Sequence, residues 1–276
     1  MPALDERKVD SHCHVLDPQR HPYLPGVRYA PTAQEIGTRA QFLAVCDAYR
    51  VDHALIVGPN SGYGDDNRCL LDMIAQGQGR FKGVAVVPND APEDQLARLQ
   101  AQGITGIAVN ATYWGVDHYL GIGPLLRRME ALGLFLQIQV EGDQLLALLP
   151  LIEASGVRLF VDHCGRPLPE AVVAQPGFAA LLALGRAGRA VIKLSGLQKL
   201  SRQSFPYEDA WPYWAALVEA FGIANCVWGS DWPFLRAPER LDYGPLLSLV
   251  DRLLPRAEDR RAVLWDNPVR LFGFRS

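Results

Sequence analysis

Two histidines separated by a single residue lie near the N-terminus. Residues 9–14 read VDSHCH, so in a strand His12 and His14 would project to the same side, about 6.5–7 Å apart along the chain. Paired imidazoles of this kind are suited to binding a ligand or a metal ion. Pairs with this spacing also arise by chance as solvated or hydrogen-bonded histidines, so the pair alone leaves both interpretations open.

A second candidate lies near the middle of the chain. Residues 160–167 read FVDHCGRP, an apolar run that stops at His163 and is followed by Arg166 in a loop between glycine and proline. His163 could be an ordinary strand-end residue. Arg166 could bind a carboxylate through two hydrogen bonds, or it could pair with an acidic side chain at the surface.

A third candidate, an aspartate, lies at the end of an apolar run near the C-terminus. Residues 227–234 read VWGSDWPF and place Asp231 between two tryptophans at the tip of a strand. Partial burial of this kind raises the pKa of a carboxyl group towards the range that suits a general base. A helix N-cap is the alternative, but the Trp-Pro pair and the late start of the next helix argue against it. The sequence therefore favours a functional role for Asp231.

The elements that must position these residues alternate between two kinds of segment. Strand-like runs lie at 9–14, 54–57, 82–87, 104–110, 134–140, 159–163, 190–195 and 226–231. Segments with helical periodicity lie at 34–50, 67–76, 92–102, 122–132, 144–154, 177–186, 210–221, 243–253 and 257–264. Eight strand–helix units without a linker or a repeat predict an α/β fold, a (β/α)8 TIM barrel, with residues 1–276 in a single domain.

A closed barrel would gather the three distant strand ends at one opening, because the carboxyl ends of all barrel strands face the same way. His12, His14, His163 and Asp231 would then converge on a space that suits a small ligand. Two long segments, 15–32 and 198–207, follow the first and seventh strands and would border this opening.

Composition limits the classes of partner. The 276 residues carry a net charge of −3 with 49% hydrophobic residues, which excludes a disordered chain and gives no general attraction to nucleic acids or anionic membranes. Five scattered cysteines without a C-x-x-C pair are typical of a reduced protein. The charged N-terminus, MPALDERKVD, does not read as a signal peptide, and the apolar segment 145–152 is too short to span a bilayer. We expect a cytoplasmic protein, and whether it forms a homo-oligomer stays open.

The motifs together resemble the amidohydrolase superfamily, and within it the branch of 2-pyrone-4,6-dicarboxylate lactonases and related sugar lactonases. The resemblance is carried by HCH at 12–14, DHCGRP at 162–167 and GSDWP at 229–233, with GPNSGYGDDN at 58–67 and KLSG at 193–196. It extends over nearly the whole chain and implies hydrolysis of a small lactone. It assigns to Asp231 the role of general base on water. It assigns to His12, His14 and His163 the polarisation of the ring carbonyl and the stabilisation of the oxyanion.

The resemblance alone does not decide whether the protein needs a metal ion. Much of the superfamily binds one or two divalent ions, but the bridging lysine or carboxylate of a binuclear site is missing here from strands 4 and 5. A mononuclear zinc or manganese site of His12, His14 and Asp231, with or without His163, remains chemically possible. Because the lactonase branch includes metal-free enzymes, we expect no cofactor. The alternatives are a mononuclear metal-dependent hydrolase or decarboxylase of the same superfamily and, less favoured, a non-catalytic barrel that binds small acids.

The chain departs from the pyrone-dicarboxylate branch on strand 4. Those enzymes carry an arginine there that helps to bind the substrate carboxylates, whereas this sequence has Ala108. The substrate could therefore carry fewer carboxylates or be a sugar lactone. The polar residues expected to line its site, or alternatively its rim, are Arg166, Asn60, Ser61, Tyr63, Lys199, Gln137 and Gln139, and Tyr113 could cover it.

Overall fold

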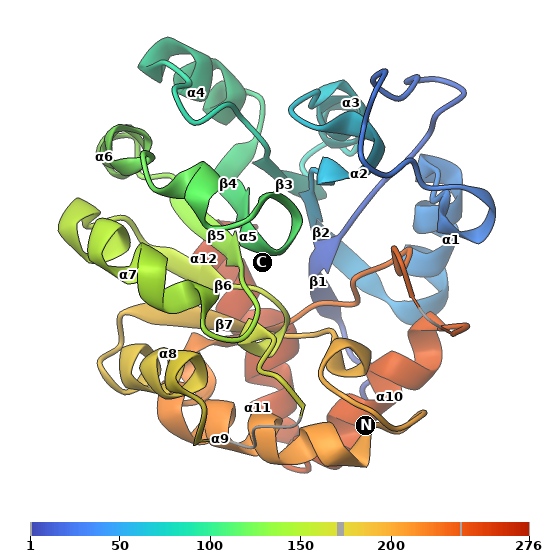
Figure 1. Ribbon diagram of the computed structural model, residues 1–276. Helices are drawn as coiled ribbons and strands as arrows, with labels where there is room; N and C mark the ends of the chain where they lie inside the picture. The colour runs from blue at the N-terminus through green and yellow to red at the C-terminus, as the bar shows by residue number, and fades with distance from the viewer. Residues whose placement is uncertain (1, 170–173, 238, 276) are drawn as a thin grey trace. The chain divides into compact units, whose positions relative to one another are not determined.

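The computed structural model describes residues 2–169, 174–237 and 239–275. Its strands form one eight-stranded sheet in which the spatial order follows the chain order, and every pair for which a register is defined is parallel (Figure 1). The strands are β1 (Lys8–Cys13), β2 (Val51–Val57), β3 (Phe81–Ala85), β4 (Ile104–Asn110), β5 (Phe135–Gln139), β6 (Leu159–Val161), β7 (Ala190–Leu194) and β8 (Cys226–Trp228). The fold is a (β/α)8 TIM barrel, which confirms the predicted class.

Contacts divide the chain into two compact units, which are described separately. The terminal unit comprises Met1–Val86, Gln102–Ile104 and Trp228–Ser276, and the central unit comprises Val87–Ala101 and Thr105–Val227. The terminal unit therefore holds His12, His14 and Asp231, whereas His163 lies in the central unit. The organisation of the chain as a single domain stays a prediction.

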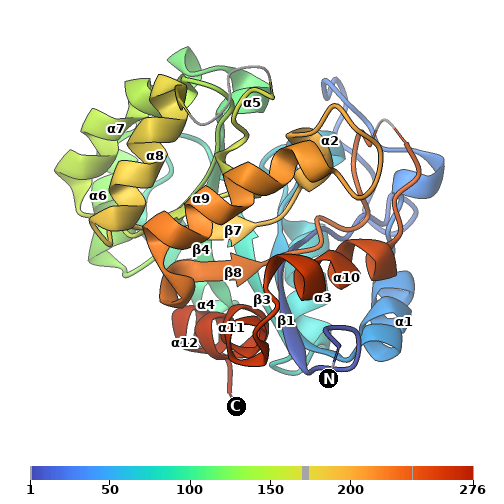
Figure 2. The same ribbon diagram turned by 90° about the horizontal axis from the view of Figure 1, so that it is seen from below.

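In the terminal unit β1, β2 and β3 pair side by side, and their residues are mostly buried, as is usual for parallel strands. The rings of Tyr49, in α1, and Tyr243, in α10, stack with centroids 4.9 Å apart. These two helices lie next to each other in Figure 2. The C-terminal helices pack against β1. The helices of this unit are α1 (Arg39–Tyr49), α2 (Asn60–Tyr63), α3 (Arg68–Gln76), α10 (Tyr243–Leu253), α11 (Ala257–Arg261), the π-helical η8 (Ala262–Asp266) and α12 (Asn267–Phe272).

In the central unit β5 pairs with β4 on one side and β6 on the other, and β7 follows β6. Successive helices α6 to α9 contact one another and form an arc in Figure 1. A side chain on Gly185 would collide with the ring of Phe221, so this glycine permits the close approach of α8 and α9. The helices are α4 (Glu93–Ala101), α5 (Ala111–Trp114), α6 (Gly123–Ala131), α7 (Gln144–Ser155), α8 (Pro176–Arg186) and α9 (Trp211–Phe221).

Short 3-10 turns complete the described chain. They are η1 (Ala33–Glu35) in the terminal unit and η2 (Asp117–Tyr119), η3 (His163–Gly165), η5 (Leu197–Lys199), η6 (Glu208–Ala210) and η7 (Ile223–Asn225) in the central unit. No helix among the described residues combines the length and apolar character needed to cross a membrane.

Most predicted elements differ from the observed ones by a few residues at their ends, and for three of them the structure shows the cause. The helix expected at 34–50 begins only at Arg39, because Thr38 caps it by accepting a hydrogen bond from the amide of Gln41. The strands expected at 159–163 and 226–231 end earlier. His163 has a φ of 49° and Asp231 a φ of 63°, and these left-handed conformations cannot continue a strand.

Candidate active site

The carboxyl end of β1 carries two imidazoles that face one carboxylate. The Nε2 atoms of His12 and His14 lie 3.7 Å and 3.5 Å from Oδ1 of Asp231. The two rings meet edge to face with centroids 5.0 Å apart. The structure therefore brings together three of the four predicted catalytic residues within the terminal unit.

A backbone carbonyl orients His14. Its Nδ1 lies 2.8 Å from the carbonyl oxygen of Val57. Because a carbonyl only accepts hydrogen bonds, Nδ1 must carry the proton, and Nε2 then points a lone pair at the carboxylate of Asp231 unless it is protonated too. Two facing acceptors repel, so the geometry calls for a proton or a bound cation between the two groups.

Asp231 occupies a strained position directly beside β1. Its φ of 63° is rare for residues other than glycine, and such conformations concentrate at functional sites. Its amide donates to the carbonyl of His12 (2.8 Å), and the amide of His14 donates to the carbonyl of Trp232 (2.7 Å). A Cβ on Gly229 would lie only 2.6 Å from the Cβ of His12, so glycine is required for this approach.

A buried carboxylate that was not predicted from the sequence, that of Asp10, lies close to His12 and Asp231 in the same unit. Asp10 is fully buried and accepts hydrogen bonds from the amide and hydroxyl of Ser230, the amide of His12 and the hydroxyl of Tyr243. Burial raises the pKa of Asp10 to about 6, against the opposing effect of these hydrogen bonds. The sequence could have pointed to Asp10, because it lies two residues before His12 in a buried strand, where charged residues are uncommon.

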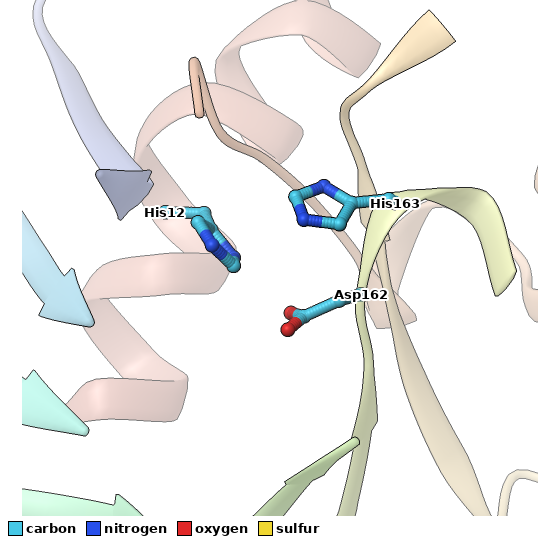
Figure 3. A group of neighbouring side chains, drawn as sticks. All are labelled: His12, Asp162 and His163. Atoms are coloured by element: carbon cyan, nitrogen blue, oxygen red, sulfur yellow. The ribbon is translucent and has the colours of Figure 1, made fainter. Parts of the chain in front are cut away.

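The fourth predicted catalytic residue lies in the central unit. Figure 3 shows His163 and Asp162 at the end of β6, and His12 at the end of β1. Nδ1 of His163 lies 3.0 Å from the hydroxyl of Ser195. A Cβ on Gly196 would lie 3.0 Å from the Cβ of His163, so the end of β7 supports the imidazole closely.

Two further predicted residues of the central unit are engaged with other side chains. Arg166 forms an ion pair with Glu141, the second of the two alternatives considered for it. Gln137 is 1% exposed, and its amide donates to Asp162 (2.9 Å) and accepts from Lys193. Gln137 thus belongs to a buried polar network among β5, β6 and β7.

The other predicted lining residues fall into two groups. Asn60, Ser61 and Tyr63 are buried on α2 in the terminal unit, where the hydroxyl of Tyr63 accepts from the amide of Asp17 (3.1 Å). In the central unit Gln139, Tyr113 and Lys199 are partly exposed, which leaves them accessible to a ligand.

A neutral polar cluster follows β4 and β5. Gln139 donates to the hydroxyl of Thr112 (3.1 Å), which donates to the amide oxygen of Asn110 (2.7 Å). This cluster contains no charged group and was not predicted from the sequence, although Asn110 and Gln139 each follow an apolar strand residue.

The residues of the terminal unit fit one divalent cation. One ring nitrogen each of His12 and His14 and a carboxylate oxygen of Asp231 all lie within 4.8 Å of one another, and the three residues are buried. Two imidazoles and a carboxylate are a ligand set of catalytic zinc sites, which keep a further position for water. The carbonyl of Val57 also holds His14 in the tautomer that a metal ligand needs.

An amidohydrolase family model matches residues 9–274. A 4-sulfomuconolactone hydrolase from Rhizobium radiobacter is 30% identical, covering 98% of this chain and 91% of the relative. A 2-pyrone-4,6-dicarboxylate hydrolase from Comamonas testosteroni is 28% identical, covering 96% and 89%. The crystal structure of a probable 2-pyrone-4,6-dicarboxylic acid hydrolase from Acinetobacter baumannii, with citric acid bound, is 27% identical with a TM-score of 0.85, covering 98% and 100%. Matching over nearly its whole length, the chain belongs to the amidohydrolase family.

Proposed function

We propose that this protein hydrolyses a small lactone, with Asp231 as the general base. The observation that carries the proposal is the Asp231 carboxylate lying within 4 Å of two buried imidazoles, at the ends of two strands of a (β/α)8 fold. Relatives that match almost the whole chain are named as hydrolases of sulfomuconolactone and of 2-pyrone-4,6-dicarboxylate. The function proposed for this chain is of the same reaction class.

In the proposed reaction Asp231 removes a proton from water as the water oxygen bonds to the lactone carbonyl carbon. The imidazoles of His12 and His14 donate hydrogen bonds to the carbonyl oxygen as it gains negative charge. The bond between the carbonyl carbon and the ring oxygen then breaks. The proton held by Asp231 passes to the departing ring oxygen, which leaves an open-chain hydroxy acid.

We include His163 in this machinery on the basis of the fold class. In (β/α)8 enzymes the carboxyl ends of the strands form the active-site face, and His163 directly follows the end of β6. Its Nδ1 is engaged with Ser195, so Nε2 is the atom proposed to contact the carbonyl oxygen. The hydrogen bond to Ser195 fixes the ring plane for this contact.

The proposed substrate carries fewer acidic groups than a pyrone dicarboxylate. Asn110, Thr112 and Gln139 form a neutral cluster, and Arg166 is already paired with Glu141. A lactone with hydroxyl groups, such as a sugar lactone, matches such partners better than a dianion does. We propose as its polar contacts the lining residues expected from the sequence: Asn60, Ser61, Tyr63, Tyr113, Gln137, Gln139, Arg166 and Lys199.

The experiment is a hydrolysis assay on a panel of aromatic-derived and sugar lactones at neutral pH, with Asp231→Asn as the test variant. Loss of the base should lower kcat by about 10²–10⁴-fold while the melting temperature changes little. Asp66→Asn, which alters a carboxylate bound to Arg68 elsewhere in the terminal unit, is the control. Full activity in Asp231→Asn would refute the assignment of the base.

A second candidate is a mononuclear metal-dependent hydrolase or decarboxylase, because His12, His14 and Asp231 form a suitable ligand set. A bound zinc or manganese ion would supply Lewis-acid polarisation of water or of the substrate. We propose the metal-free enzyme, in which Nε2 of His14 carries a proton. Elemental analysis of protein purified without chelator separates the two: one bound equivalent, with activity lost on its removal, supports the metal enzyme, whereas an active metal-free preparation supports the lactonase proposed above.

A further inference from the structure

We propose that Asp10 is a positioning residue that holds the general base Asp231 at a fixed place beside His12. The inference rests on the proposed function in that it takes Asp231 as the base. Asp10 is itself fully buried and acts through its hydrogen bonds to the two chain segments that carry the reacting groups.

The carboxylate of Asp10 joins β1 directly to the segment that follows β8. Its Oδ1 accepts from the amide of Ser230 (2.9 Å) and the amide of His12 (3.2 Å). Its Oδ2 accepts from the hydroxyl of Ser230 (2.6 Å) and the hydroxyl of Tyr243 (3.1 Å). One side chain thus binds the residue directly before Asp231 twice and His12 once, across more than two hundred residues of sequence.

The same hydrogen bonds extend to both sides of Asp231. The hydroxyl of Ser230, which donates to Asp10, accepts from the amide of Trp232 (2.9 Å). The carbonyl of Trp232 accepts from the amide of His14, and the amide of Asp231 donates to the carbonyl of His12. The left-handed conformation of Asp231 is therefore held by the Asp10 side chain, which binds Ser230, and by the backbone of His12 and His14, which binds Asp231 and Trp232.

A carboxylate suits this position better than a neutral group. Four donors converge on Asp10, and its two oxygens together can accept all four. Asparagine has a single acceptor oxygen, so its NH₂ group would face the hydroxyls of Ser230 and Tyr243 and force them to reorient. Alanine would leave the donors without any acceptor. Either change should loosen the segment around Asp231, whose conformation is unfavourable on its own.

The test measures both turnover and local protection. We expect Asp10→Ala to lower kcat by about 100-fold with KM within about threefold, since misplacing a reacting group by about 1 Å can cost that much. Hydrogen exchange of the peptide covering 229–234 should accelerate at least about tenfold, while exchange in β2 stays unchanged. Asp10→Asn should fall between wild type and Asp10→Ala in both measurements.

Lys8→Met is the matched control. Lys8 is also buried and charged and lies on the same strand, but its ammonium group donates to the carbonyls of Glu6 and Tyr49, away from Ser230. It should leave kcat and the exchange of 229–234 near wild type even if it lowers the melting temperature.

The outcomes are separable. A kcat for Asp10→Ala within threefold of wild type, or unchanged exchange of 229–234, overturns the positioning role. If Asp10→Ala does not fold, Asp10→Asn and Ser230→Ala decide in its place by the same criteria. If the wild-type protein hydrolyses none of the lactones tested, the proposed function fails, while the exchange measurement still decides whether Asp10 holds the segment.

Discussion

Asp231, His12 and His14, the catalytic residues proposed in the terminal unit, lie close together, and burial determines how strongly they interact. The side chains of His12 and Asp231 are 2% and 3% exposed, and that of His14 is 11% exposed. Because these side chains are largely shielded from solvent, charges among them interact much more strongly than at the surface. A proton or a cation held among these atoms therefore has a large effect on the chemistry they can perform.

At the same scale, the hydroxyl of Ser195 should set the orientation of His163. Ser195→Ala removes the partner of Nδ1, so the ring can rotate and the choice of tautomer is lost. We expect kcat on a responsive lactone to fall about 10–100-fold, measured by steady-state kinetics. Ser155→Ala, which removes a buried hydroxyl at the end of α7, should leave kcat unchanged. Equal kinetics in the two variants would show that His163 needs no such partner.

At the scale of elements, the strands that carry candidate residues end where the chain turns into left-handed conformations. After β6, His163, Cys164 and Arg166 all have φ between 44° and 55°, and after β8 Asp231 has a φ of 63°. Glycines on adjoining segments leave room for these turns, as Gly196 does beside His163. The strained ends are held by their neighbours rather than by local preference.

Gly196 and Gly188 provide a matched pair of positions for testing whether neighbouring segments hold the strained strand ends. Both have positive φ, but a Cβ on Gly196 would press on His163, whereas nothing lies within 4 Å of one on Gly188. Gly188→Ala should lower the free energy of unfolding by about 1–2 kcal/mol, from backbone strain alone. Gly196→Ala should cost about 1–3 kcal/mol more and also reduce activity. Urea denaturation measures both, and equal losses would mean that His163 moves aside freely.

The buried lysine at the start of β1, Lys8, should make the stability of the protein depend on pH. Burial lowers the pKa of Lys8 to about 8 from 10.5, so the folded state releases this proton at lower pH than the unfolded state. The free energy of unfolding should therefore rise as pH increases from about 8 to 10.5, by at most about 3 kcal/mol. Lys8→Met should remove this rise in urea denaturation at several pH values. A rise of the same size in the variant would assign it to other groups.

At the scale of the whole molecule, the reactivity of the five cysteines measures how tightly the protein is packed. All five side chains are buried, and burial raises the pKa of Cys46, Cys164 and Cys226 to about 12. Thiolates are the reactive form, so thiols in such surroundings are inert while the protein is folded.

We expect no fast reaction of the folded protein with a thiol-specific disulfide reagent at pH 8, and five reacting thiols per chain in concentrated urea. Absorbance of the released thiolate measures both. A cysteine that reacts within seconds without denaturant would show that part of the core opens readily.

Much of the fold and the proximity of three candidate residues could be predicted from the sequence. The alternation of β-branched runs with helical periodicity is a local property, so it predicted the order of strands and helices and the (β/α)8 class. The same reading placed His12, His14 and Asp231 at strand ends, where the structure brings them together. Element ends were less accurate, because left-handed residues such as His163 are held by distant partners.

The sequence by itself determined the architecture and the chemical types of the candidate residues, since both follow from periodicity and from short motifs. Only the tertiary structure decided the partners: Asp10 bound to Ser230, Gln137 enclosed beside Lys193, and Arg166 paired with Glu141. The physical reason is that a polar side chain is satisfied by whichever donor or acceptor packing brings within about 3 Å. Such a partner can lie more than two hundred residues away, and no local spacing records it.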